Sequence, residues 1–107
     1  MLYELRMYEI MPGRMAEIDA RFREHTTMFF ARHGVEVVGF WHEMVGSSDR
    51  LVYITVFDDM ADREQKWGAF ISDPDWQQIR QQTEADGPLV RRVINRFLIP
   101  TDYSPGP

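Results

Sequence analysis

Four side chains in this sequence have the chemical character to bind an anion or to move a proton. Arg6 and Tyr8 alternate on one face of a predicted strand, where a guanidinium can hold an anionic or enolate oxygen and a phenol can exchange a proton. His25 lies at helical spacing within an apolar series, and imidazole titrates near neutral pH. Arg63 is one helical turn from Trp67, on a helix face that we expect to be buried. We predict these four residues as candidate catalytic groups.

Each of the four also has a structural interpretation. Arg6 and Tyr8 share their strand face with Glu4, so the three can form an ion-pair network that stabilises a dimer if this face points into its interior. His25 can be a core histidine bonded to a carbonyl or hydroxyl group. Arg63 can extend to solvent or pair with a carboxylate, because an unpaired buried charge costs several kcal/mol. The carboxylates nearest to it in sequence are Glu64 and Asp59.

Large side chains near these groups could form the walls of a small-molecule site. Aromatic rings give a pocket its apolar surface, and a few polar groups then fix the ligand's orientation. The tryptophans can equally belong to the core, and a histidine just before Gly34 can favour the negative end of its helix. The predicted substrate-binding residues are Trp41, Trp67, Phe22, Phe29, His33 and Trp76.

Several kinds of chemistry are disfavoured by composition. The chain has no cysteine, which removes disulfides, thiolate nucleophiles and cysteine-ligated metals. Its three histidines lack the HxH or HExxH spacing of metal sites, and only analogy would make His25 a haem ligand. The sequence has no glycine-rich phosphate loop, GxSxG elbow or dinucleotide fingerprint. We therefore expect neither a metal nor a cofactor.

The charge pattern argues against nucleic acids and membranes as partners. The net charge is −5, with no run rich in lysine or arginine. No apolar run approaches the roughly 18 residues that a membrane span needs. The first ten residues alternate and carry charges, unlike a signal peptide. Together with the absence of cysteine, this pattern leads us to expect a cytoplasmic protein.

The elements that must position these residues follow from the hydrophobic periodicity. Leu2 to Ile10 alternates as a strand and ends at Pro12-Gly13. From Met15, apolar positions step by three and four to Arg32 or His33, which predicts one continuous helix. Residues 35–45 form a second predicted strand with Gly39 as a bulge or a point of close packing. Their alternation puts Val35, Val37 and Trp41 on one face and Val38, Phe40, His42 and Met44 on the other.

The second half of the chain repeats this order. Residues 46–49 predict a hairpin turn, and residues 51–57 a strand that is apolar on both faces. A helix capped by Asp59 or Asp62 ends before Pro74, and Asp73 can cap a second helix that starts there. The predicted inward stripe of the helix that ends before Pro74 is Met60, Arg63, Glu64, Trp67, Phe70 and Ile71. Residues 89–99 form the last predicted strand.

The order βαββαβ predicts an α+β, ferredoxin-like domain spanning residues 1–107. Its four-stranded antiparallel sheet would carry the helices on one face. The other face would be bare yet apolar, with Tyr53 among its residues, and would exceed the apolar patch that a monomer normally exposes. We therefore expect a homodimer formed through the sheet faces.

Four motifs resemble the NIPSNAP family in sequence and in order. They are YELRMYEIMPG, RHGVEVVGFW, REQKWGAFISDPDW and LIPTDYSP, and the resemblance covers roughly residues 2–105. It implies a dimeric α+β barrel, in which two ferredoxin-like sheets face each other. The related superfamily includes cofactor-independent monooxygenases, haem-using chlorite-degrading enzymes and muconolactone isomerases. Its pockets usually lie within each subunit, between the sheet and the helices.

Three functions are consistent with these observations. The first is a small enzyme without a cofactor, acting by proton transfer or by oxygenation of an aromatic or polyketide-like substrate. The second is a module that binds a small apolar or aromatic ligand without transforming it. The third is an interaction protein whose barrel faces a larger partner. The abundance of aromatic residues and the inward polar candidates favour the first two.

Overall fold

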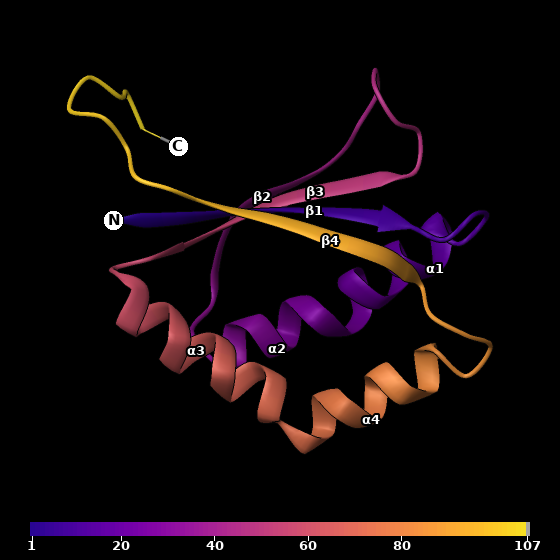
Figure 1. Cartoon of the computed structure of the whole chain (residues 1–107). Helices are drawn as coiled ribbons and strands as arrows, with labels where there is room; N and C mark the ends of the chain where they lie inside the picture. The colour runs from indigo at the N-terminus through magenta and orange to yellow at the C-terminus, as the bar shows by residue number, and fades with distance from the viewer. Residues whose placement is uncertain (107) are drawn as a thin grey trace.

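A computed structural model of the chain describes residues 1–106 and contains one four-stranded antiparallel sheet in the order β2-β3-β1-β4 (Figure 1). The predicted α+β fold with βαββαβ order is confirmed. None of the helices in residues 1–106 has the length and apolarity needed to cross a membrane. The elements are β1 (Leu2–Ile10), α1 (Met15–Arg21), the π-helical turn η1 (Phe22–Thr26), α2 (Thr27–Arg32), β2 (Glu36–His42), β3 (Arg50–Phe57), α3 (Met60–Ser72), α4 (Pro74–Thr83) and β4 (Val90–Leu98).

The inner strand β1 separates two environments by simple alternation. It is bonded to β3 on one side and to β4 on the other, so its residues cannot rotate to the opposite face. Glu4 and Arg6 are buried beneath the helices, whereas Tyr3, Leu5 and Met7 are only partly covered. The ladder places Arg6 opposite Tyr53, so both side chains point toward the helices.

Tyr53 therefore lies on the helix-covered face, and the prediction that it faces the bare side is wrong. Its side chain is fully buried, with ring centroids 5.4 Å from Phe22 and 6.0 Å from Phe30. Strand β3 is apolar on both faces, so alternation alone could not tell which set is covered. The polar groups of β1 decide it, because Glu4 is bonded to Arg63 of α3.

A bulge in β2 changes which side chains share a face. Val37 pairs with Thr55 but Gly39 pairs with Ile54, so one residue is left over. The bulge predicted at Gly39 is therefore confirmed, and a Cβ there would meet the Trp41 ring at 2.9 Å. Beyond the bulge the alternation is inverted. Val37 and Phe40 both face the helices and Trp41 faces the other side, so the predicted shared face of Val37 and Trp41 is wrong.

The predicted break between the last two helices is confirmed. The Asp59 carboxylate caps α3 by accepting from the Asp62 amide at 2.8 Å, and Asp73 caps α4 from the Asp75 amide at 2.9 Å. Pro74 occupies the first turn of α4. Helix α3 buries Trp67 and Phe70, but Met60, Glu64 and Ile71 of the predicted stripe are exposed, because only the central part of that stripe meets the sheet.

The first helical segment is not the regular α-helix that we predicted. Its middle, Phe22–Thr26, is a π-helical turn, which takes one more residue than an α-helical turn. Thr26 consequently occupies a buried position and His25 is only partly buried, whereas Arg21 is already buried beside Ile18 at the end of α1. The Thr26 hydroxyl donates to the Arg21 carbonyl at 3.3 Å, which pairs a carbonyl beside the turn. Simple three-and-four spacing cannot reveal this shift.

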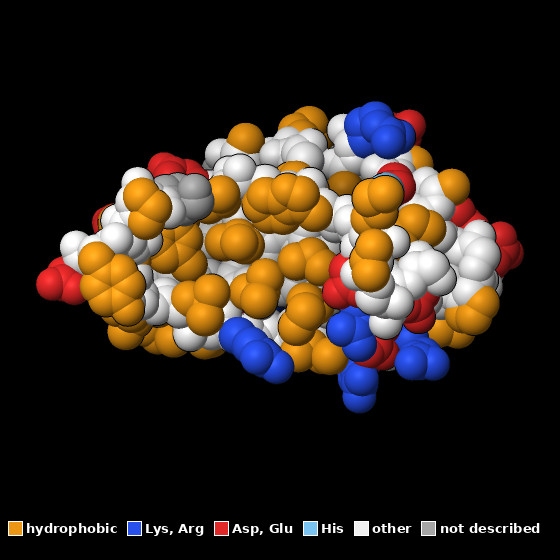
Figure 2. All heavy atoms as spheres, turned by 90° about the horizontal axis from the view of Figure 1, so that it is seen from above, with side chains coloured by type: hydrophobic (Ala, Val, Ile, Leu, Met, Phe, Trp, Pro, Cys, Tyr) orange, Lys and Arg blue, Asp and Glu red, His pale blue; other side chains and the backbone are white. Residues whose placement is uncertain are grey.

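The opposite side of the sheet, which we call the open face, carries no helix within residues 1–106. Figure 2 views the molecule from this side and shows hydrophobic side chains gathered over most of its centre. All of them are partly or largely exposed. From the strand pairing, they are Tyr3, Leu5, Met7, Trp41, Val52, Ile54, Val56, Ile94 and Leu98.

Candidate functional site

A cavity of about 500 Å³ lies between the β1–β4 side of the sheet and the helices. Arg6 and Tyr8 of β1 line it from the sheet, and Trp67 and Trp76 line it from α3 and α4. Arg21 closes it from the end of α1. Its outer part is formed by exposed arginines of α4 and β4 and by the half-buried Glu84 just after α4. The arginines are Arg80, Arg91 and Arg92. The lining is therefore rich in positive charge, although the whole chain is acidic.

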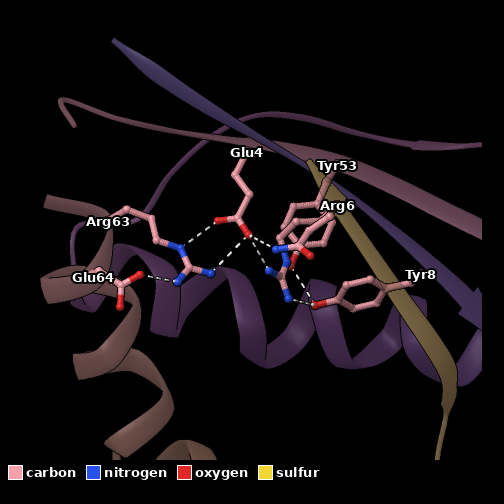
Figure 3. Close-up of polar contacts among 7 residues, drawn as sticks. Glu4, Arg6, Tyr8, Tyr53, Arg63 and Glu64 are labelled. Atoms are coloured by element: carbon pink, nitrogen blue, oxygen red, sulfur yellow. Dashed lines mark hydrogen bonds and ion pairs between the residues drawn. The ribbon is translucent and has the colours of Figure 1, made fainter. Parts of the chain in front are cut away.

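The polar centre beside this cavity is built around Glu4, which is fully buried (Figure 3). Arg6 Nη1 donates to its carboxylate at 2.8 Å, and Asn95 Nδ2 at 3.0 Å. Arg63 Nε and Nη2 donate to its two oxygens at 3.0 and 3.2 Å, a bidentate arrangement. Burial alone would raise the pKa of Glu4, but hydrogen bonds from Arg63 and Asn95 and the charge of Arg6 lower it. Glu4 therefore stays ionised.

Two phenols continue this network toward the cavity. Arg6 Nε donates to the Tyr53 hydroxyl at 2.8 Å, and the Tyr53 and Tyr8 hydroxyls are 2.7 Å apart. Burial raises the pKa of Tyr53 well above its ordinary value, and the neighbouring Tyr8 adds to the rise against the opposing effect of Arg6. Tyr53 thus remains protonated at neutral pH. It connects the Arg6 cation to Tyr8, which lines the cavity.

Aromatic rings form the apolar wall of the site. The guanidinium of Arg6 lies 4.3 Å from the Trp67 ring centroid, close enough for a cation–π interaction. Trp67, Phe70 and Trp76 follow one another with centroid distances of 5.1 and 4.9 Å. Such packing holds the rings in place before any ligand enters. A planar apolar molecule would therefore meet a preformed surface beside charged donors.

The structure brings four predicted site residues together at the cavity: Arg6, Tyr8, Trp67 and Trp76. Phe22 and Phe29 lie in the core behind it, where Phe22 contacts the Tyr8 ring at 5.9 Å and Phe29 the Trp76 ring at 5.7 Å. The predicted polar network of Glu4, Arg6 and Tyr8 exists, but it faces the helices and not the open face. Arg63 is not among the residues that line the cavity, but it joins that network from α3. It pairs with Glu4 and, as one alternative anticipated, with Glu64 at 2.9 Å.

The remaining predicted residues lie elsewhere. His25 lines a separate hollow of about 280 Å³ between the first helical segment and the end of α4. His33 is 2.7 Å from the Asp73 carboxylate, at the corner where α3 meets α4. This hydrogen bond, with contributions from the Asp75 amide and Arg32, lowers the pKa of Asp73 to about 2. Trp41 is on the open face, so it and Trp67 are on opposite sides of the sheet.

Sequence reasoning missed Arg21 as part of this site, placed Tyr53 on the bare face, and gave Glu4 a structural role in an ion-pair network. Glu4 carried a usable signal, since it shares a strand face with Arg6 and Tyr8. Tyr53 lay within a strand apolar on both faces, and Arg21 is a charged residue one helical turn after Ile18 that the apolar periodicity passes over. No cluster of three or more histidine or acidic residues in residues 1–106 has a metal-binding arrangement.

Comparison with known proteins identifies the family. The NIPSNAP family model matches residues 3–105. This chain belongs to the NIPSNAP family. Among curated NIPSNAP proteins, NipSnap homolog 2 of Danio rerio is 26% identical over 97% of this chain, and that of Homo sapiens 27% over 97%. Each alignment covers 35% of the relative, so the chain spans about a third of their length.

Solved structures agree with this assignment. A NIPSNAP family protein from Agrobacterium tumefaciens is 26% identical, with a TM-score of 0.87 over 97% of this chain and 96% of its own. A NIPSNAP domain protein from Burkholderia xenovorans is 23% identical, with the same TM-score over 99% and 100%. An antibiotic biosynthesis monooxygenase, 12% identical, has a TM-score of 0.64 over 94% and 99%. That last similarity shows a shared fold alone.

Proposed function

We propose that this NIPSNAP protein binds a small planar aromatic molecule in the cavity between its sheet and helices, with a hydroxyl or enolate oxygen of the ligand at Tyr8. The observation that carries this proposal is the chain of hydrogen bonds from Arg6 through Tyr53 to Tyr8, which ends at an aromatic-walled cavity. A cation at the buried end of such a chain polarises every hydroxyl in it. Tyr8 would then donate to an oxygen that carries negative charge.

The same arrangement would support proton transfer. Because Arg6 already donates to Tyr53, the Tyr53 proton can be donated to Tyr8, and the Tyr8 proton is then free for the ligand. Transfer of that proton to an enolate would leave a phenolate stabilised by Arg6 through Tyr53. This geometry supports a proton-transfer enzyme, as well as a binding protein. Oxygenation of an electron-rich aromatic compound is a further reaction to assay.

The test uses 2-naphthol, a neutral planar phenol, titrated into wild-type protein by isothermal calorimetry. Loss of the Tyr8 hydrogen bond in Tyr8→Phe should weaken binding about tenfold, the usual effect of a hydrogen bond to a polarised group. Tyr103→Phe removes the same hydroxyl from a side chain that is 83% exposed, so it is the matched control. Absence of binding to the wild type, or equal binding to Tyr8→Phe, would refute the proposal.

Catalysis can be separated from binding with the same compound. In deuterium oxide, proton transfer at the ring carbon next to the hydroxyl carbon replaces hydrogen by deuterium, which proton NMR detects as loss of that signal. Wild-type protein should accelerate the exchange and Tyr8→Phe should not. If the protein binds 2-naphthol but does not accelerate the exchange, its function is ligand binding and not proton transfer.

We also propose that the open face packs against a second copy of the chain. The apolar residues of this face form one surface across all four strands (Figure 2). A two-fold dimer would cover this surface on both copies at once. Ile54→Arg puts a charge on an inner strand of that face and should produce monomers in analytical ultracentrifugation. Gln78→Arg, on the exposed side of α4, should leave the dimer intact; an unchanged dimer in Ile54→Arg would place the interface elsewhere.

A further inference from the structure

Arg21 is a buried cation with an incomplete set of partners. It projects from the end of α1 and is only 6% exposed. Its Nη1 donates to the Thr83 hydroxyl at 3.3 Å and is 3.7 Å from the Glu84 carboxylate. Its Nε is buried and has no hydrogen-bond partner among residues 1–106. Burial also lowers the pKa of Arg21, although an arginine stays charged at any physiological pH.

Two other arginines near the cavity, Arg6 and Arg63, have closer carboxylate partners than Arg21. Arg6 and Arg63 reach the Glu4 carboxylate at 2.8 and 3.0 Å. Among residues 1–106, the one ion-pair partner of Arg21 is Glu84 at 3.7 Å, and Glu84 also pairs with Arg80 at 3.4 Å. A buried charge with so little compensation costs stability, so a reason other than folding is needed for its presence. Binding of an anion would supply that reason.

The position of Arg21 is suited to a ligand in the cavity. It lines the 500 Å³ cavity and also the smaller hollow that contains His25, so it forms the wall between them. Its guanidinium carbon is 5.5 Å from the Trp76 ring centroid, which keeps it beside the aromatic wall. Within the cavity, the positive charge of Arg6 is already balanced by Glu4. Arg21 is therefore the inner cation available to a bound molecule.

We propose that Arg21 binds a carboxylate group of the cavity's ligand, so that the ligand is an aromatic hydroxy acid. The argument rests on the proposed function, which places the hydroxyl group at Tyr8. Nη1 of Arg21 is directed to Thr83, which leaves the edge made by Nε and Nη2. That edge matches the two oxygens of a planar carboxylate. Because Nε is covered in the free protein, the side chain turns toward the cavity when the acid binds.

The experiment compares 6-hydroxy-2-naphthoate with its neutral amide, 6-hydroxy-2-naphthamide, by calorimetry. The two compounds differ in charge but have the same shape, and their polar groups lie at opposite ends of the rings. Wild-type protein should bind the acid at least about tenfold more tightly than the amide. Arg21→Gln should remove this preference while still binding the amide. Arg23→Gln, which changes an exposed arginine of the same helical segment, should retain it.

The outcomes separate the two proposals. If both compounds bind wild-type protein equally, or if Arg21→Gln keeps the preference, the assignment of Arg21 is wrong while the proposed function stands. If neither compound nor 2-naphthol binds, the proposed function fails and this inference fails with it. A second variant, Arg21→Met, tests the cost of the charge without a ligand. It should melt at or above the wild-type temperature, and a clearly lower melting temperature would show that Arg21 serves the fold instead.

Discussion

Glu4 and Glu9 are two acids of one strand, both nearly inaccessible and both bonded to arginines, but they lie on opposite faces of the sheet. The partners of Glu4 come from three elements, and its two arginines are largely buried, Arg63 with a side chain 14% exposed. Glu9 is reached by Arg50, Arg91 and Arg92 from the open face and its edge, and the side chains of the last two are more than 60% exposed. From this difference we expect the stability that a carboxylate contributes to depend on the burial of its partners and not on their number.

The largest effect is expected from Glu4→Gln. The neutral amide would leave Arg6 beneath the helices without a carboxylate partner and Arg63 with the exposed Glu64, which should lower the free energy of unfolding by about 3–5 kcal/mol. Urea denaturation followed by circular dichroism measures this loss. If the loss is no larger than that of Glu9→Gln, the contrast between the two faces is wrong.

An intermediate effect is expected at Asp73, a third buried acid whose partners are partly exposed. Its carboxylate accepts from His33 at 2.7 Å and Arg32 at 3.0 Å. The His33 hydrogen bond, with the help of the Asp75 amide and Arg32, lowers its pKa from 3.8 to about 2. Because the folded protein favours the ionised form, this stabilisation is present above about pH 4 and is lost as the pH falls through about 2.

Asp73→Asn is the variant to measure, because asparagine also caps helices well and so isolates the charge. Its melting temperature should be lower than that of the wild type at pH 7, and the gap should close between about pH 4 and pH 2. A gap that stays constant across this range would mean that the charge of Asp73 contributes nothing.

A smaller effect is expected from Glu9→Gln. Its ion pairs are in contact with water, so side-chain mobility and solvent screening reduce their contribution. The loss of melting temperature should be small at low ionic strength and smaller still in 1 M NaCl, where the screening length is about 3 Å. A loss that does not respond to salt would show that Glu9 behaves like Glu4.

The smallest effect is expected from His25→Phe. His25 lies on the helix-covered side of the sheet but outside the Glu4 network. His25 is partly exposed beside a separate hollow, so the free energy of unfolding should change by no more than about 0.5 kcal/mol. Binding of 2-naphthol should also be unchanged. Weaker binding in this variant would restore His25 to the site and extend the site beyond the wall formed by Arg21.

Local chemistry explains why much of the fold could be predicted. The cap at Asp59, the Asp73-Pro74 junction and the alternation of β1 depend on residues within a few positions of one another. The faces of β2 could not be predicted beyond Gly39, because one extra residue in the ladder inverts all that follow. The faces of β3 could not be predicted either, since both carry apolar residues.

The candidate site was predictable only where one element holds several of its members. Arg6 and Tyr8 were found because they alternate on one strand with Glu4. The true partner of Arg63 is 59 positions away in the chain, and no local spacing indicates it. The partial exposure of His25 depends on the π-turn, which three-and-four periodicity does not distinguish from an α-helix.

The irregular turn at Phe22–Thr26 has a consequence for how this site could have arisen. Each residue of a regular helix advances the side chains by about 100° around its axis, so one added residue rotates everything on one side of it relative to the other. A single codon inserted in this turn would thus suffice to bring Thr26 inward in place of His25, while Arg21, which precedes the turn, keeps its position beside Ile18. The core behind the site, to which α2 contributes Phe29 and Phe30, therefore depends on that one residue of added length.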